Sequence, residues 1–398
     1  MSAAVLRDTR KPHFTALPPL SLYVHLPWCV KKCPYCDFNS HEQSRNARGA
    51  LGELPFAEYV SALIRDLEAM LPSIWGRRLT GIFIGGGTPS LFPAAEIDAL
   101  LGAVRARMPL EPGAEITMEA NPGAAEAGRF RGYRDAGVNR LSVGVQSFDE
   151  AMLSRLGRIH SADEARRAIG MALEIFGNVN IDLMYGLPGQ TLAMARADME
   201  EGVRHGTPHF SAYQLTIEPN TVFFSQPPKL PDHDLSADMQ VMVEETLGAA
   251  GFEHYETSAF ARPGHRCRHN LNYWEFGDYV GIGAGAHGKL SFADRVTRHE
   301  RLKQPREYLA TTGDVQELVI EPRELPFEFM LNALRLVEGF PADLFAARCG
   351  LPLSLIESRL VVAEEKNLIE RSAKRIQPTE RGRAFLNDLV ALFLPAKE

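Results

Sequence analysis

Short apolar segments alternate with longer segments of helical periodicity from Leu22 to about residue 250. This alternation is typical of βα units around a parallel sheet. The expected strands are 22–26, 80–85, 115–119, 140–145, 179–184 and 211–217, and the expected helices are 56–71, 94–107, 124–136, 161–176, 190–205 and 233–250. Six units are too few for a closed eight-stranded barrel. We therefore expect an α/β fold, an open, partial (β/α)6 barrel of the TIM type.

Polar motifs fall at the carboxyl end of nearly every expected strand. In parallel sheets the loops at these ends build the binding site. The motifs are the cysteines after the first strand, GGGTPS (85–90) after the second, Glu119 and Asn121 after the third, Gln146 after the fourth, and DLMYGLPG (182–189) on the fifth. We expect them to meet at one rim of the barrel.

Three cysteines, Cys29, Cys33 and Cys36, follow the first strand with the spacing C-x3-C-x2-C. Three thiolates at this spacing can hold three irons of a [4Fe-4S] cluster and leave the fourth iron without a protein ligand. Because an open iron site binds a small molecule readily, the motif favours a cluster that works with a second cofactor.

Zinc and disulfides are the alternatives for these thiols. Zinc would take His25, Asp37 or His41 as a fourth ligand, but structural zinc sites usually add a second, distant ligand pair, which the sequence lacks. Five cysteines, three of them within eight residues, and no recognisable secretion signal argue against disulfides.

The composition excludes several classes of protein. No apolar run is long enough to cross a bilayer, so we expect no transmembrane segment. A net charge of -7 argues against nucleic acid as a partner, because binding phosphates needs a basic face. Few thiols and no signal peptide favour a cytoplasmic location.

The pattern changes beyond residue 300. Expected helices at 325–339, 341–348, 353–366 and 380–394, with a two-stranded wing before the last, predict a small helical, winged-helix-like domain. Its candidate recognition helix carries Glu357, Glu364 and Glu365, which would be repelled from a DNA groove. We expect an N-terminal arm (1–20), a barrel with a following extension (21–295) and a C-terminal domain (296–398).

The cysteine motif and the GGGTP loop resemble those of the radical S-adenosylmethionine (SAM) superfamily. The resemblance implies that SAM chelates the open iron through its amino and carboxylate groups, and that the loop of Gly86, Gly87 and Thr88 contacts the amino group. Taken alone, a glycine triplet is often only a strand-to-helix turn.

Four further residues match the superfamily pattern in order: Glu119, Gln146, Arg158 and Asp182. A zwitterionic methionine end needs a carboxylate and a guanidinium, and ribose hydroxyls suit Gln and Asp. Each residue alone is equally consistent with an ion pair or a polar strand end. Tyr23 and Tyr35 also match cofactor-contact positions, with packing of their rings beside the cluster as the alternative.

A second motif, HNLNYW (269–274), precedes the glycine-rich segment GDYVGIGAGAHG (277–288). Imidazole is a common ligand of haem iron, so His269 or His287 is a candidate ligand, with Tyr273 or Trp274 stacking on the macrocycle. Without a C-x-x-C-H motif, a lone histidine is equally a hydrogen-bonded structural residue. Cys267 is a further candidate thiolate ligand. We expect Cys349 to be a buried, small apolar side chain.

From Ser21 to about residue 390 the chain resembles the family of oxygen-independent coproporphyrinogen III oxidases and their relatives. The oxidases carry a fourth cysteine where this chain has Phe38, whereas a haem-chaperone branch carries H-N-x-x-Y-W, here His269, Asn270, Tyr273 and Trp274. The resemblance implies a protein that binds haem and transfers it to acceptors, membrane-bound respiratory enzymes among them, with a SAM-bound cluster. The alternative is a radical SAM oxidase acting on a porphyrinogen.

Overall fold

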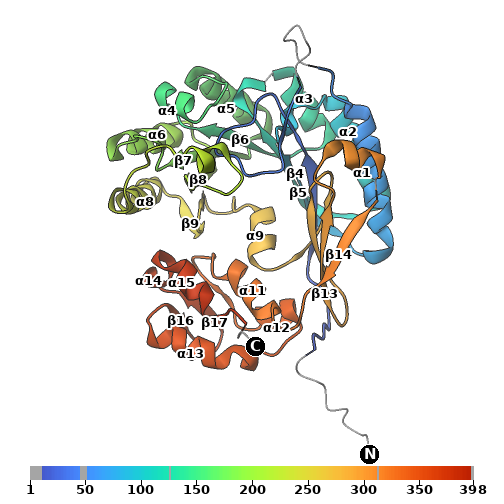
Figure 1. Ribbon diagram of the computed structural model, residues 1–398, viewed down its shortest axis with the longest axis vertical. Helices are drawn as coiled ribbons and strands as arrows, with labels where there is room; N and C mark the ends of the chain where they lie inside the picture. The colour runs from blue at the N-terminus through green and yellow to red at the C-terminus, as the bar shows by residue number, and fades with distance from the viewer. Residues whose placement is uncertain (1–10, 45–51, 125–126, 312, 396–398) are drawn as a thin grey trace, which may run out of the picture.

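The computed structural model describes residues 11–44, 52–124, 127–311 and 313–395. Its centre is a run of neighbouring parallel strands that forms an open, curved sheet (Figure 1). These strands are β1 (Leu20–Leu26), β4 (Leu79–Gly86), β5 (Leu110–Ala120), β6 (Arg140–Gln146), β7 (Val179–Tyr185) and β8 (His209–Gln214). The predicted partial (β/α)6 barrel is confirmed.

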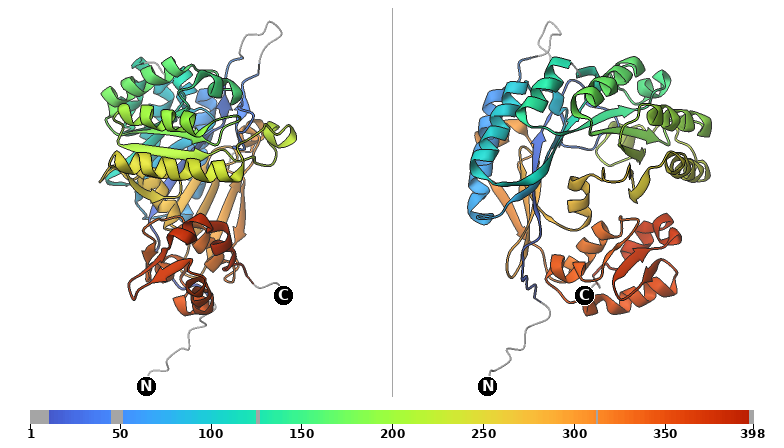
Figure 2. Two further views of the ribbon diagram at one scale, coloured as in Figure 1. Left: turned by 90° about the vertical axis from the view of Figure 1, so that its left-hand side faces the viewer. Right: turned by 180° about the vertical axis from the view of Figure 1, so that it is seen from behind.

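Helices cover the outer face of this sheet (Figures 1 and 2). They are α1 (Phe56–Met70), α2 (Ala94–Arg107), α3 (Ala127–Ala136), α5 (Ala162–Phe176), α6 (Leu192–Arg204) and α8 (His233–Ala249), with the short α4 (Glu150–Arg155) and α7 (Val222–Ser225) between them. Alternate strand residues such as Leu22, Val24 and Ile84 are buried under the helices. Residues at the intervening strand positions, such as Tyr23, Phe83 and Asp182, point the other way and are only half-buried. The period of two along each strand therefore separates the core from the barrel interior.

Both edges of the sheet are extended by strands that we did not predict. β11 (Asp278–Ile282) runs parallel to β1 and leads into the antiparallel strands β12 (His287–Ser291), β13 (Val296–Arg301) and β14 (Val315–Val319). β10 (Ala259–Ala261) and β9 (Glu253–Glu256) continue from β8. Lys289 of β12 is buried in an ion pair with Asp278, so a charged residue interrupts the apolar pattern of a strand.

The C-terminal part is a helical, winged-helix-like unit, as predicted. It contains α11 (Leu325–Ala333), α12 (Leu344–Cys349), α13 (Glu357–Glu365), α14 (Glu380–Ala384) and α15 (Leu386–Ala391), with strands β15 (Phe340–Pro341), β16 (Ile369–Arg371) and β17 (Arg375–Pro378). Phe329, Phe340 and Phe345 form the centre of its own apolar core. The first helix ends six residues before the predicted end at residue 339.

Contacts cross both boundaries of the proposed domain division. The boundary between residues 295 and 296 lies within the β12–β13 hairpin, and Val296 belongs to the C-terminal core. Phe14 of the N-terminal arm packs in the same core, and the amide of His13 donates to the Gly350 carbonyl at 2.8 Å. Residues 1–10 lie outside the described part, and the division remains a proposal.

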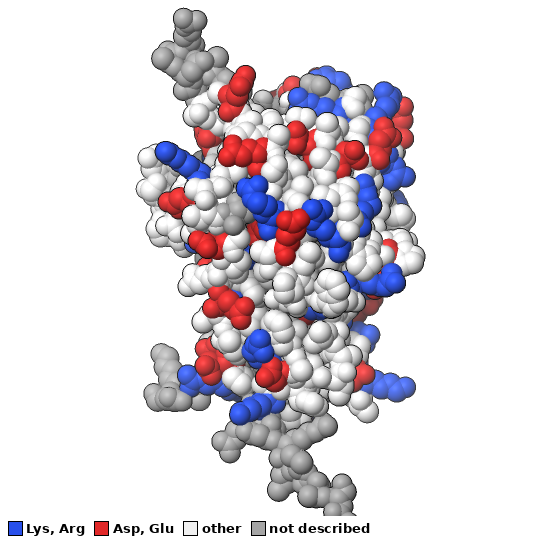
Figure 3. Space-filling model, turned by 90° about the vertical axis from the view of Figure 1, so that its right-hand side faces the viewer, with Lys and Arg blue, Asp and Glu red and all other residues white. Residues whose placement is uncertain are grey.

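Charge on the face shown in Figure 3 is mixed, with acidic and basic side chains interspersed. None of the helices that the structure describes is long and apolar enough to span a membrane.

Candidate functional site

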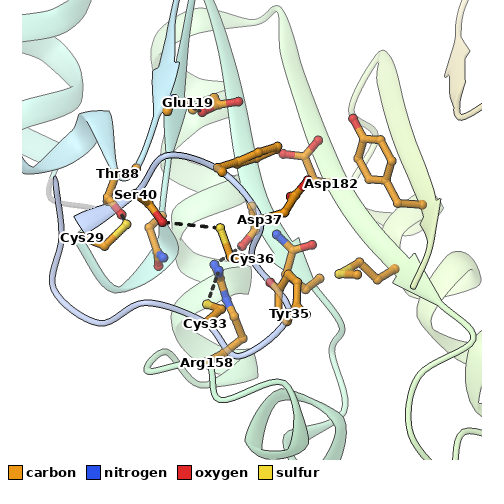
Figure 4. Close-up of a pocket in the computed structure, with 18 of the residues that line it drawn as sticks. Cys29, Cys33, Tyr35, Cys36, Asp37, Ser40, Thr88, Glu119, Arg158 and Asp182 are labelled. Carbon is orange, nitrogen blue, oxygen red and sulfur yellow. Dashed lines mark hydrogen bonds between the residues drawn. The ribbon is translucent and has the colours of Figure 1, made fainter. Parts of the chain in front are cut away.

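The three motif cysteines lie on an irregular loop at the carboxyl end of β1. Cys29 ends β2 (Trp28–Cys29), which pairs with β3 (His41–Glu42), so residues 30–40 form a loop closed at its base. Cys29 is buried, Cys33 and Cys36 are half-buried, and all three are free thiols (Figure 4).

Each thiol has a polar neighbour from a different element. Thr88 Oγ1 donates to Cys29 Sγ at 3.4 Å, Ser40 Oγ lies 3.5 Å from Cys36 Sγ, and Arg158 Nη1 donates to Cys33 Sγ at 3.6 Å. Burial raises the pKa of Cys29 to about 11 and also raises the pKa of Cys36. At neutral pH these two thiols lose their protons only when a cation such as iron binds the sulfur atoms instead.

A cavity of about 340 Å³ opens beside the thiols. It is lined by eleven of the residues proposed from the sequence: Cys29, Cys33, Tyr35, Cys36, Gly86, Gly87, Thr88, Glu119, Gln146, Arg158 and Asp182. They come from the loop after β1, from the carboxyl ends of β4, β5 and β6, from the middle of β7 and from the segment after α4 (Figure 4). The structure thus brings the polar strand ends together at one rim.

The glycine triplet allows β4 to approach the strand that carries Cys29. A Cβ atom on Gly87 would lie 2.7 Å from the carbonyl oxygens of Pro27 and Trp28, and one on Gly86, whose φ is +117°, would lie 2.7 Å from the His25 ring. The amides of Gly87 and Thr88 donate to the Leu26 and Trp28 carbonyls, both at 2.8 Å. Protein packing by itself therefore requires glycine here.

Two carboxyl groups face the cavity from neighbouring positions of the barrel interior. Glu119 Oε2 accepts from the Gly86 amide at 3.1 Å, and burial together with the nearby Asp182 raises the pKa of Glu119 to about 8. Burial also raises the pKa of Asp182, although Ser142 and Asn180 donate to it. Burial and the nearby Asp182 therefore favour a proton on Glu119, and a ligand N–H donor would favour the carboxylate.

Gln146 and Arg158 complete the rim beside β6. Gln146 has a φ of +70°, in the left-handed region that non-glycine residues seldom occupy, and it directs the chain out of the strand at the cavity wall. Arg158 Nη2 donates to the Gly144 carbonyl at 2.8 Å. This bond fixes the guanidinium between the cavity and Cys33.

The H-N-x-x-Y-W motif lies elsewhere. It forms the short helix α9 (Arg268–Trp274), which lies against β4 on the inner side of the barrel (Figure 1). None of its four motif residues lines the cavity. The His269 ring stacks on Phe83, with 4.2 Å between ring centroids and an interplanar angle of 15°.

His269 has the properties of a neutral imidazole. Its Nδ1 atom is buried without a hydrogen-bond partner, and burial with the nearby Arg140 lowers its pKa to about 3. Tyr273 meets the His269 ring edge-on at 4.6 Å. Only a neutral imidazole can donate a lone pair to a metal.

The remaining motif residues have different surroundings. Arg335 of the C-terminal part lies over the Trp274 ring at 4.3 Å, whereas Asn270 is half-buried on α9. Tyr23 is not at the cavity either; its hydroxyl donates to His25 Nδ1 at 2.8 Å, and its ring stacks on Phe83.

The other haem candidates fit less well. His287 is exposed and lies 3.5 Å from Glu300. Cys267 is buried, and burial raises its thiol pKa to about 12. His287 is not shielded from solvent, and Cys267 keeps its proton, whereas a cysteine binds a metal as the thiolate.

The sequence reasoning missed several residues of the cavity wall, among them Ser40, Ser142 and Tyr213. Ser142 shares the inward face of β6 with Gly144 and Gln146, so the strand period alone could have identified it. Nothing in the sequence marks Ser40 or Tyr213.

The arrangement of the thiols suits a cluster better than a single ion. No three His, Cys, Asp or Glu side chains in the described ranges are grouped closely enough to hold one metal ion. The thiols line an open cavity instead, which fits a cluster whose irons occupy separate corners.

Comparison with known proteins agrees with this geometry. Residues 23–201 match the model of the radical SAM superfamily, and residues 320–385 match that of the HemN C-terminal domain. The protein named heme chaperone HemW of Escherichia coli (strain K12) is 49% identical over 380 residues, which cover 95% of this chain and 99% of the relative. The chain belongs to the HemW family.

Two further relatives match over different shares of their length. The Haemophilus influenzae heme chaperone HemW is 48% identical over 95% of this chain and 98% of its own length. A mouse relative, radical S-adenosyl methionine domain-containing protein 1, mitochondrial, is 40% identical over 72% of this chain and 67% of its own.

The solved structure of Escherichia coli coproporphyrinogen III oxidase (HemN), described as a radical SAM enzyme, has the same fold. It superimposes with a TM-score of 0.77, 23% identity and coverage of 95% of this chain and 90% of the oxidase. This chain thus shares its fold with the oxidase.

Proposed function

We propose that this chain is a haem chaperone that binds haem and transfers it to acceptor proteins. In this proposal Cys29, Cys33 and Cys36 hold a [4Fe-4S] cluster whose open iron binds SAM. The observation that carries the cofactor part is the cavity of about 340 Å³ with three free thiols on its wall. Membership of the HemW family, whose bacterial members are named heme chaperones, supports the haem part.

The cavity residues have distinct tasks in this proposal. Glu119 accepts a hydrogen bond from the amino group of SAM, and Arg158, which lies beside Cys33, pairs with the SAM carboxylate. Gln146 and Asp182 bind ribose hydroxyls, and Gly86, Gly87, Thr88 and Tyr35 shape the wall. When bound, the cluster supplies one electron at a time and a coordination site for SAM.

The residues of α9 hold the haem in this proposal. His269 supplies the axial imidazole, which its low pKa keeps neutral, while Asn270, Tyr273 and Trp274 shape the surrounding surface. Haem-accepting proteins, membrane-bound respiratory enzymes among them, are the proposed partners, and the cytoplasm is the proposed location.

A hemin titration tests the haem part. Purified protein should gain a Soret band that saturates near one haem per chain, and His269→Ala should weaken the band and lower the affinity at least about tenfold, because one axial bond is lost. His287→Ala is the matched control, since it removes an exposed imidazole outside the motif. An unchanged titration in His269→Ala would remove this histidine from the proposal.

Anaerobic reconstitution tests the cluster part. Wild-type protein should bind about four irons per chain, and Cys33→Ala should lose most of them while Cys349→Ala, at a buried thiol outside the loop, should not. The same preparation distinguishes the alternative function. Conversion of coproporphyrinogen III by the reduced protein would favour a radical SAM oxidase, whereas haem binding without turnover supports the chaperone.

A further inference from the structure

The segment after the third cysteine is tied to a distant turn. Asn39 Nδ2 donates to the carbonyls of Ala284 at 2.9 Å and of Lys303 at 2.8 Å. Asn39 Oδ1 accepts from His41 Nε2 at 3.2 Å, and the Asn39 carbonyl accepts from His25 Nε2 at 2.9 Å. One side chain thus joins the cysteine loop to a segment about 245 residues later in the chain.

The receiving turn, residues 283–285 between β11 and β12, is shaped to fit this segment. A Cβ atom on Gly285 would lie 2.3 Å from Asn39 Nδ2, and one on Gly283 would lie 2.4 Å from the His25 carbonyl oxygen. Both glycines have positive φ, +73° and +108°. Their missing side chains provide the space that Asn39 and His25 occupy.

The turn itself is held rigidly. The Tyr59 hydroxyl donates to the His25 carbonyl at 3.0 Å and accepts from the Ala284 amide at 2.8 Å. The Gly283 amide donates to Asp66, which is buried in an ion pair with Arg301. A turn fixed by buried groups can position a loop that has little regular structure of its own.

We propose that the 283–285 turn, acting through Asn39, positions the cysteine loop for cluster binding. Asn39 is a positioning residue rather than a ligand: its amide is used in bonds to backbone carbonyls, and Ser40, the next residue, lies beside Cys36 Sγ. The proposal rests on the proposed cluster and gives the glycine-rich turn between β11 and β12 a role at the same site. Without this turn, the conformational freedom of residues 30–40 opposes the convergence of three thiols.

The test uses full-length protein reconstituted anaerobically with limiting iron and sulfide. Asn39→Ala and Gly285→Ala should each lower cluster occupancy roughly fivefold or more, since each removes or displaces the bonds to the turn. They should also change the electron paramagnetic resonance spectrum of the remaining reduced cluster, with and without SAM, while circular dichroism shows an intact fold.

Gly76→Ala is the matched control. Gly76 has nearly the same φ, +76°, but nothing lies within 4 Å of an added Cβ, so this variant carries the backbone strain without the collision. It should load like wild type. The double variant Asn39→Ala/Gly285→Ala should be no worse than the more affected single variant, because both changes act on one contact.

The outcomes separate this proposal from the proposed function. Full occupancy and an unchanged spectrum in Asn39→Ala and Gly285→Ala would overturn the positioning role while leaving the cluster intact. An equal loss in Gly76→Ala and Gly285→Ala would overturn it as well, since strain alone would then suffice. Failure of wild-type protein to bind iron and sulfide would instead contradict the cluster.

Discussion

Single residues of this protein owe their chemistry to where the barrel interior places them. Glu119 is an ordinary glutamate in sequence, but burial and the neighbouring Asp182 raise its pKa to about 8. His269 shows the opposite sign, because burial disfavours its cation and lowers its pKa to about 3. Both groups are therefore neutral at pH 7, and each gains from a different kind of ligand.

The pKa of Glu119 predicts how SAM binding depends on pH. The carboxylate form accepts better from the amino group, and below pH 8 its population falls about tenfold per pH unit. The ratio of SAM affinities, wild type over Glu119→Gln, should therefore rise roughly eightfold between pH 6.5 and 7.5 and level off above about pH 9. Anaerobic calorimetry on both proteins measures this ratio and cancels the titration of SAM itself. A ratio independent of pH would show that Glu119 does not ionise on binding.

Helices begin and end where predicted when the local sequence carries a strong capping signal. α5 begins with a capping box, in which Ser161 Oγ accepts from the Glu164 amide and the Glu164 side chain accepts from the Ser161 amide. The predicted and observed bounds of this helix differ by one residue. α11 ends early because residues after Ala333 bond elsewhere, with Val337 donating to the Tyr255 carbonyl at 3.1 Å and Leu336 bridging to Glu256.

Removing the cap of α5 should lower stability without affecting the site. Ser161→Ala should reduce the free energy of unfolding by about 1 kcal/mol, because the Glu164 amide loses its acceptor. Ser154→Ala, at an exposed position of α4, should change it by less than about 0.5 kcal/mol. Urea unfolding measures both, and equal effects would contradict the capping argument. Cluster occupancy should stay at the wild-type value in both variants.

The whole molecule is held together by segments that are remote in sequence. Phe14 from the N-terminal segment packs in the core of the C-terminal unit, and Arg266 joins Glu253 of β9 to Glu338 beyond α11. In Figure 2 the C-terminal unit lies below the open side of the barrel, close to α9. Residues near both described ends of the chain therefore pack in the same apolar core, that of the C-terminal unit.

Phe14→Ala should test this connection. Losing a ring that is 7% exposed should cost about 3–5 kcal/mol of unfolding free energy. Phe385→Ala, at a ring 51% exposed, should cost far less. Thermal and urea unfolding measure the difference, and limited proteolysis should cut the N-terminal segment earlier in Phe14→Ala only. A cost no larger than that of Phe385→Ala would mean that Phe14 does not stabilise the C-terminal core.

The sequence by itself determined the alternation of strands and helices, the polar strand ends and the cysteine spacing, because each is a local pattern of period two, 3.6 or a fixed interval. Only the tertiary structure decided that β11–β14 extend the sheet, that α9 lies apart from the cavity, and that Asn39 meets the turn at 283–285. The physical reason is that these features depend on contacts between residues far apart in the sequence: β11 pairs with β1, His269 stacks on Phe83, and Asn39 bonds to Ala284. Contacts of this kind produce no periodic pattern in the sequence. Buried ion pairs such as Lys289–Asp278 also place charged residues in strands, which obscures the apolar pattern by which those strands could be recognised.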